Sequence, residues 1–238
     1  MEEKKKIEMN IADTMMEKPI GFEINGRHFC LYTATLGKMH LISRLIECLD
    51  MNLTVLEVNP YIESLRLCSE KKDIVCRILA YYTMSRRYDI QNEIKVKKRT
   101  DFFNNNLDYK ELAEILMIVL TWEDVQSYIK FLGLDKEQAV RKKITDYKQK
   151  KSSTLDFGGK STYGILIDWA CQRYGWTFDY VVWGISYANL QMLMADAIIS
   201  IHLSDEEKKD LRIYDSDIID ANDPKNREII RAMLKQQS

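Results

Sequence analysis

Proline and glycine are scarce in this chain, with 3 and 9 among its 238 residues. Sandwiches and barrels made of strands need many tight turns, where these two residues are enriched, so their scarcity favours helices. The length suits one or two globular domains. The apolar share of 46% is ordinary for a chain that buries a core. We therefore expect a mainly α-helical protein.

Metal-binding and disulfide motifs are also lacking. The cysteines are odd in number and form no Cys-x-x-Cys pair, which disfavours a zinc knuckle or a disulfide framework: Cys30, Cys48, Cys68, Cys76 and Cys171. The histidines, His28, His40 and His202, are not spaced as in His-Glu-x-x-His. A nucleophilic pair of Cys30 with His28 or His40 could form only through the fold. We expect no metal, no cofactor and no catalytic residue.

The chain has neither a long apolar run nor a strong charge of one sign. Near its middle the longest apolar run is Ile115 to Leu120, far short of the ~18 residues of a membrane span. The first ten residues contain no apolar core of a signal peptide. The net charge is −1, so the basic runs Lys95 to Arg99 and Arg141 to Lys151 are interpreted as solvated helix faces. Contact with phosphates, or between the linker and the acidic tail, is the alternative. Neither a membrane nor nucleic acid is the expected partner.

One segment carries a strong β signal. Residues Gly21 to Tyr32 contain Asn25-Gly26 between two short runs of strand formers. Asn-Gly is the preferred pair for a type I′ turn, because both central residues need a positive φ. We predict a two-stranded hairpin, which must pack on helices or pair with another chain because a lone hairpin is marginal in water.

Helical periodicity begins at Thr35 and predicts a domain organisation. Asn59 before Pro60 and the Asp108–Glu111 capping box mark two helix starts. The polar stretch around Gly158-Gly159 indicates a linker. The predicted parts are an N-terminal arm (1–20), a hairpin with a helical domain (21–147), a linker (148–163), a small helical domain (164–212) and an acidic tail with a terminal helix (213–238).

The linker contains "GGKST", Gly158 to Thr162, which invites a phosphate-loop interpretation. The Walker A pattern needs a further glycine at position 154, where this chain has Thr154. A flexible linker is the preferred interpretation, and a phosphate-handling enzyme using Lys160 is the alternative. The acidic segment Asp215 to Asp217 lacks converging ligands and is interpreted as solvated.

The most distinctive stretch is "YGWTFDYVVWGISYANLQMLMADAII", residues 174–199. Thr177 and Ser186 can cap two helices within it. Large aromatics suit the core of a small helical unit, because each removes much area from water. Methionines suit an apolar groove that accepts an amphipathic helix. Both interpretations stay open, and the predicted partner-binding residues are Trp176, Tyr180, Trp183, Tyr187, Met192 and Met194.

The order of hairpin, helical domain, polar linker and small C-terminal unit resembles the tail assembly chaperones of long-tailed bacteriophages. The specific likeness lies in Tyr174 to Ala197, where an aromatic-Gly-Trp motif precedes a short helix, a serine and a longer helix. The resemblance implies a non-catalytic protein of the host cell cytoplasm that binds the tape measure protein and the tail tube protein during tail morphogenesis. Copies of the chain could also associate with each other. A phage structural or scaffold protein retained in the virion is the alternative.

Overall fold

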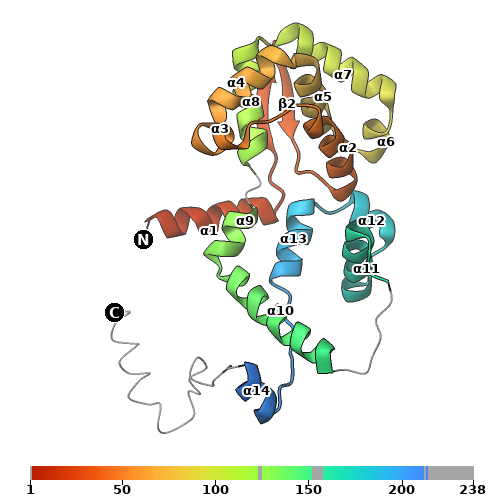
Figure 1. The fold of residues 1–238 in the computed structure, drawn as a ribbon. Coiled ribbons are helices and arrows are strands. Elements are labelled where there is room, and N and C mark those ends of the chain that lie inside the picture. The colour runs from red at the N-terminus through yellow and green to blue at the C-terminus, as the bar shows by residue number, and fades with distance from the viewer. Residues whose placement is uncertain (1, 123–124, 152–157, 212, 214–238) are drawn as a thin grey trace. The chain divides into compact units, whose positions relative to one another are not determined.

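The computed structural model is mostly helical and contains one antiparallel hairpin, as the composition predicts (Figure 1). It describes residues 2–122, 125–151, 158–211 and 213. The chain divides into two compact units, and the first comprises residues 1–135 and 156–197. The second comprises residues 136–155 and 198–238. None of the helices in the described ranges has the length and apolarity to cross a bilayer.

Most of the described elements belong to the first unit. Its strands are β1 (Ile20–Ile24) and β2 (Arg27–Leu31). Its helices are α1 (Glu2–Met15), α2 (Leu36–Glu47), α3 (Leu53–Val58), α4 (Pro60–Glu70), α5 (Lys72–Tyr82), α6 (Arg87–Ile90), α7 (Glu93–Asn106), α8 (Tyr109–Thr121), α9 (Val125–Phe131), α11 (Thr162–Tyr174), α12 (Phe178–Trp183) and α13 (Tyr187–Ala195). Helix α10 (Leu134–Lys151) begins in this unit and continues into the second, which also contains α14 (Asp205–Leu211).

The hairpin forms where the sequence predicts it. Asn25 and Gly26 have φ values of 49° and 73°, so both turn residues lie in the left-handed region that a type I′ turn requires. Phe22 pairs with Phe29 across the strands, and their rings stack at 5.7 Å. The ring of Phe29 also meets that of Phe103 on α7 at 5.2 Å. The hairpin is thus anchored on a helix through its aromatic face.

The predicted helix starts are confirmed by their hydrogen bonds. The Asn59 side chain accepts from the Ile62 N–H at 3.2 Å, with Pro60 in the first helical turn. Asp108 and Glu111 form the reciprocal capping box of α8. Thr177 and Ser186 accept from backbone N–H groups three residues on and begin α12 and α13. Because each signal depends on groups only three residues apart, it is legible in the sequence.

A buried carboxylate of α4, paired with Arg66, fixes the loop between α2 and α3. The Glu63 side chain is 1% exposed and accepts hydrogen bonds from the Asn52 N–H at 2.7 Å and from Arg66 Nη2 at 2.6 Å. The same Arg66 nitrogen donates to the Asp50 carbonyl at 2.9 Å. Asp50 has a φ of 57°, in the left-handed region that few residues other than glycine, asparagine and aspartate adopt. Arg66 and the Asn52 N–H hold the pKa of Glu63 below its usual 4.5, against the opposing effect of burial.

The C-terminal helices pack on the N-terminal ones within the first unit. Met192 on α13 is buried in a cluster with residues of α9, and α1 covers that cluster. Val181 and Leu190 join Leu36 of α2 in another cluster. The backbones of Thr35 and Ser186 form an isolated antiparallel bridge. Asn189 donates to the Met15 carbonyl and to Glu17, each at 3.0 Å.

This packing differs from the predicted domain boundaries. Residues 156–197 belong to the same compact unit as residues 1–135, whereas the sequence predicts a separate domain over 164–212. The predicted arm (1–20) contains a 14-residue helix, α1, whose Ile7, Ile11 and Met15 pack against the α9–α13 cluster. The reason is burial, since α13 is apolar on more than one side and needs neighbours on each. Of the predicted linker (148–163), residues 148–151 continue α10 and residues 152–157 lie outside the described residues.

In the described part of the second unit, helices α10 and α14 are joined by side-chain contacts. Tyr147 on α10 donates its hydroxyl to Asp210 on α14, and Lys151 pairs with the same carboxylate at 3.0 Å. Asp210 precedes the predicted acidic tail (213–238), so contact between the linker and that tail stays a prediction. The helix predicted to begin at Pro224 and the acidic residues Asp215 to Asp217 lie outside the described residues.

Replacing Glu63 tests the buried ion pair. We expect Glu63→Gln to lower the free energy of unfolding at neutral pH by about 1–3 kcal/mol, since it leaves Arg66 without its closest counter-charge. The native pKa of Glu63 lies below the unfolded value of 4.5, so this contribution is present above that pH and disappears as the pH falls through the native pKa. Urea unfolding of wild type and variant across this range measures the difference.

Glu70→Gln is the matched control, because Glu70 also pairs with Arg66, at 2.7 Å, but is 52% exposed. It should change the free energy of unfolding by less than about 0.5 kcal/mol. Equal effects of the two changes would contradict the special role of the buried carboxylate.

Adding one methyl group at Gly37 tests the close packing of α12 against α2. A Cβ at Gly37 would stand 2.6 Å from the ring of Trp183, so we expect Gly37→Ala to lower stability by about 1–3 kcal/mol. In a Trp183→Ala background the same change should stabilise the protein by up to about 1 kcal/mol, because alanine favours a helix over glycine. Thermal unfolding of the four proteins measures the cycle, and an unchanged sign in both backgrounds would refute the close contact.

Candidate functional site

An apolar groove lies in the first unit where α11 and α12 meet α2. Its volume is about 640 Å³, within the range of pockets that hold ligands. The residues that line it come from α2, from α5 to α7, and from α11 and α12: Leu36, Gly37, His40, Leu41, Tyr81, Ile90, Gln91, Glu93, Tyr163, Ile167, Phe178, Val182 and Trp183. Most of these side chains are apolar, so the groove suits an apolar segment of a partner.

Exposed aromatic rings border this apolar groove. Phe178 is 64% exposed and Tyr163 is 45% exposed, although large aromatics are usually well covered. Phe178 is the first residue of α12, and the Thr177 cap fixes its position at the helix start. The spacings Tyr163–Ile167 and Phe178–Val182 are each four residues, which puts each pair on one helix face. Apolar area that stays open beside a groove marks an interaction surface.

Charged groups at the groove are already paired. Arg87 forms an ion pair with Asp179, and its guanidinium carbon lies 5.3 Å from the ring of Trp183. Glu93 accepts from Arg77 Nη2 at 2.8 and 2.9 Å. Because these charges are paired within the protein, they oppose an apolar ligand less. The apolar lining residues therefore dominate the character of the groove.

The structure separates the residues predicted to bind a partner. Trp183 lines the apolar groove and also packs against the large N-terminal cluster. Trp176 and Tyr187 are half-buried against the cluster around Val181, and Met192 is 5% exposed in the α9–α13 cluster. Tyr180 and Met194 are 45% and 44% exposed but do not line the groove.

Sequence reasoning overlooked the other groove residues. Phe178 and Val182 stand in the same aromatic stretch, and the four-residue spacing was the available signal. The contributions of α2, by contrast, are visible only in the fold, because His40 and Leu41 lie more than a hundred positions away in the sequence. The assignment of the six predicted residues to partner binding stays a prediction.

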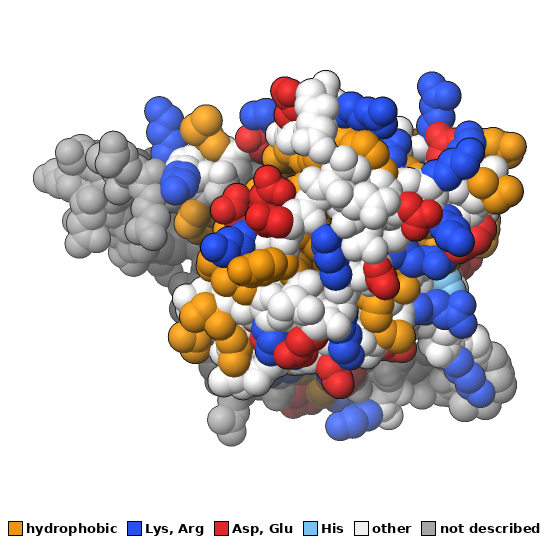
Figure 2. Space-filling model, turned by 90° about the horizontal axis from the view of Figure 1, so that it is seen from above, with side chains coloured by type: hydrophobic (Ala, Val, Ile, Leu, Met, Phe, Trp, Pro, Cys, Tyr) orange, Lys and Arg blue, Asp and Glu red, His pale blue; other side chains and the backbone are white. Residues whose placement is uncertain are grey.

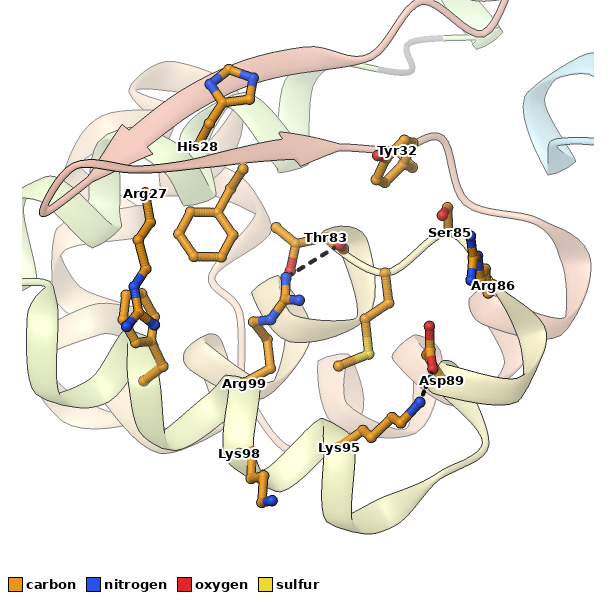
Figure 3. Close-up of a pocket in the computed structure, with 13 residues that line it drawn as sticks. Arg27, His28, Tyr32, Thr83, Ser85, Arg86, Asp89, Lys95, Lys98 and Arg99 are labelled. Carbon is orange, nitrogen blue, oxygen red and sulfur yellow. Dashed lines mark hydrogen bonds and ion pairs between the residues drawn. The ribbon is translucent and has the colours of Figure 1, made fainter.

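A second hollow, the basic pocket, lies beneath strand β2 (Figure 3). Its volume is about 660 Å³. The lining comes from β2, the loop after α5, α6 and α7: Arg27, His28, Phe29, Tyr32, Thr83, Met84, Ser85, Arg86, Asp89, Lys95, Lys98, Arg99 and Phe102. Five of these described residues are Lys or Arg and one is an acid. On the face shown in Figure 2, basic and acidic side chains are interspersed, so the pocket departs from the even mixture seen there.

Two arginines in the basic pocket are placed against aromatic rings. The guanidinium carbon of Arg99 lies 5.2 Å from the centroid of Phe29, and Nη1 donates to the Thr83 carbonyl at 3.4 Å. Arg27 lies in the same way 5.0 Å from Phe102. Burial lowers the pKa of Arg99 from its usual value, which means that its charge is incompletely solvated.

The acid in the basic pocket is neutralised by its neighbour. Lys95 forms an ion pair with Asp89, and this bond is the main reason that the pKa of Asp89 lies below its usual range. In the described part of the chain, Arg27, Arg86 and Lys98 form no ion pair. With five basic residues and one acid in its described lining, the pocket presents a net positive charge.

One histidine–cysteine pair lies at the edge of the basic pocket, on strand β2. His28 Nε2 lies 3.6 Å from Cys30 Sγ, so the fold does bring this pair together, from alternate positions of β2. In the described ranges, His28 has no second hydrogen-bond partner that would orient its ring, as a nucleophile's base requires. No group of three metal-ligating side chains occurs in the part of the chain that the structure describes.

The "GGKST" stretch begins a helix. The Ser161 side chain accepts from the Gly164 N–H at 3.2 Å and caps α11. Gly158 and Gly159 have φ values of 97° and 65°, so both need the freedom of glycine. Lys160 is exposed. These local roles account for the glycines and the serine without a phosphate.

Comparisons with protein-family models, with curated proteins and with solved structures give no match for this chain.

The thiols provide a test of the chemistry at β2. Burial raises the pKa of Cys68 and of Cys76 to about 12, so these thiols stay protonated at pH 8. We expect a chromogenic disulfide reagent to modify the exposed Cys48 first, and to reach Cys68 and Cys76 only in denaturant. Cys48→Ser should abolish the fast phase. A fast phase that survives there but is lost in Cys30→Ser would instead mark Cys30 as an activated nucleophile beside His28.

Proposed function

We propose that this protein binds an amphipathic helix of a partner in the apolar groove and acts as a non-catalytic chaperone in bacteriophage tail assembly. The observation that carries the binding part is the open groove with the exposed ring of Phe178 at its edge. The assignment to tail assembly rests on the sequence resemblance over Tyr174 to Ala197.

The walls of the groove support a helical occupant. They are themselves helices, namely α2, α11, α12 and parts of α5 to α7, and a further helix lying along the open side of the groove would complete the packing. An amphipathic helix presents apolar residues at positions i, i+3, i+4 and i+7 to such a groove. The paired charges of Arg87 and Asp179 beside Trp183 suit the polar flank of that helix.

The proposed partners are the tape measure protein, whose long apolar helices need cover before the tube assembles, and the tail tube protein. The proposed place of action is the host cell cytoplasm. The second candidate, a structural or scaffold protein, would remain in the particle. Mass spectrometry of purified virions separates the two, because an assembly chaperone should be missing from them.

Co-expression with the tape measure protein tests the proposal at the groove. We expect the wild-type protein to keep that partner in the supernatant and to co-purify with it. Phe178→Ser should weaken the affinity roughly 5–30-fold, as expected for the loss of about 1–2 kcal/mol from an aromatic anchor. Because Phe178 is 64% exposed, the variant should keep its thermal unfolding temperature.

Val58→Ser is the matched control, since Val58 is 83% exposed and lies outside the groove. It should bind as the wild type does. A partner that is equally insoluble with and without this protein would refute the chaperone function, and equal binding by both variants would move the binding site away from the groove.

A further inference from the structure

We propose that the basic pocket binds a nucleotide unit, that is, a phosphate group together with an aromatic base. The unit comes either from a free nucleotide or from single-stranded nucleic acid. This inference is independent of the proposed function, because it concerns a different hollow with different chemistry.

The charge of the basic pocket calls for an anion. Arg27 and Arg99 approach it from opposite sides, one from strand β2 and the other from helix α7 (Figure 3). Arg86 adds a third guanidinium from the loop before α6. Guanidinium groups offer paired N–H donors whose geometry matches phosphate oxygens. Figure 3 shows Arg27 and Arg86 toward opposite ends of the pocket with Arg99 between them, so a phosphate beside Arg99 would add to the negative charge that Asp89 supplies to this group of cations.

The apolar residues of the lining indicate an organic ligand rather than an inorganic ion. The volume of about 660 Å³ is large for a phosphate alone and is in the range of pockets for organic ligands. Tyr32, Phe29, Met84 and Phe102 contribute rings and a thioether to the walls. Bases stack on aromatic rings and on arginine planes, and the arginine beside Phe102 offers such a plane.

Preorganisation favours this ligand further. The contacts of Arg99 with Phe29 and with the Thr83 carbonyl restrict its side chain before any ligand arrives. A restricted side chain loses less conformational entropy on binding. Arg99 is also partly desolvated, as its lowered pKa indicates, so an incoming anion meets a charge that is weakly screened.

Binding of a labelled oligothymidylate at low salt tests the inference. We expect the wild type to bind it with an affinity that falls as salt rises, with a slope of about 0.7 per phosphate contact. The double variant Arg27→Gln, Arg86→Gln should bind about tenfold or more weakly. Both arginines are exposed, so the fold should survive, and thermal unfolding checks this.

The control variant carries Arg44→Gln with Lys97→Gln, which removes the same charge from exposed positions outside the basic pocket. It should bind within about twofold of the wild type if the contacts are local. Equal weakening in both double variants would indicate a diffuse charge effect and would overturn the site. Failure of the wild type to bind would overturn it as well.

Competition experiments distinguish the sources of the ligand. Displacement of the label by adenosine monophosphate identifies a free nucleotide as a sufficient ligand. Displacement by unlabelled oligonucleotide alone identifies single-stranded nucleic acid, and either result supports the inference. Displacement by inorganic phosphate at the same concentration as the mononucleotide would remove the role of the base. Equal displacement by polyglutamate would show an acidic protein site instead.

Discussion

Gly37 has no side chain, and the ring of Trp183 lies where a Cβ would stand, 2.6 Å away. This one close approach seats α12 on α2, and the neighbouring bridge between Thr35 and Ser186 continues the same contact along the backbone. Since α13 begins directly after that bridge, its position against α1 and α9 follows from it. The apolar groove also depends on it, because Gly37 and Trp183 both line its wall.

Local sequence signals predict much of this fold, whereas no signal in the sequence predicts the long-range packing. The Asn25-Gly26 turn and the Asp108–Glu111 capping box act over two to four residues, so their residue types suffice. The hydrogen bonds of Asn189 to Met15 and Glu17 join groups more than 170 positions apart, and nothing in the composition announces them. The first compact unit likewise joins residues 1–135 with residues 156–197, and a polar linker in the sequence does not reveal that grouping.

The sequence predicts an apolar binding surface in this region, but it identifies only some of the residues that line the groove. An aromatic stretch with methionines indicates a large apolar surface. Periodicity does not show which of these side chains are buried in the core and which stay exposed. Met192 and Met194 illustrate this, because they are two residues apart and only Met194 is exposed. A helix that is apolar on more than one side gives no preferred face, so burial is decided by its neighbours. Trp183 is shared, with part of its ring in the core and part at the groove.

Net charge conceals how the charges are distributed. The run Lys95 to Arg99 lies on one helix, but it becomes a pocket only because the hairpin brings Arg27 over it. Helices α6 and α7 stand between the two hollows: Asp89 and Lys95 line the basic pocket, whereas Ile90 and Glu93 line the apolar groove. The Asp89–Lys95 ion pair joins these two helices, and the Asn92 N–H donates to the Asp89 carbonyl at 3.2 Å. The two hollows therefore share a wall, and a ligand that displaces α6 or α7 in one changes the lining of the other.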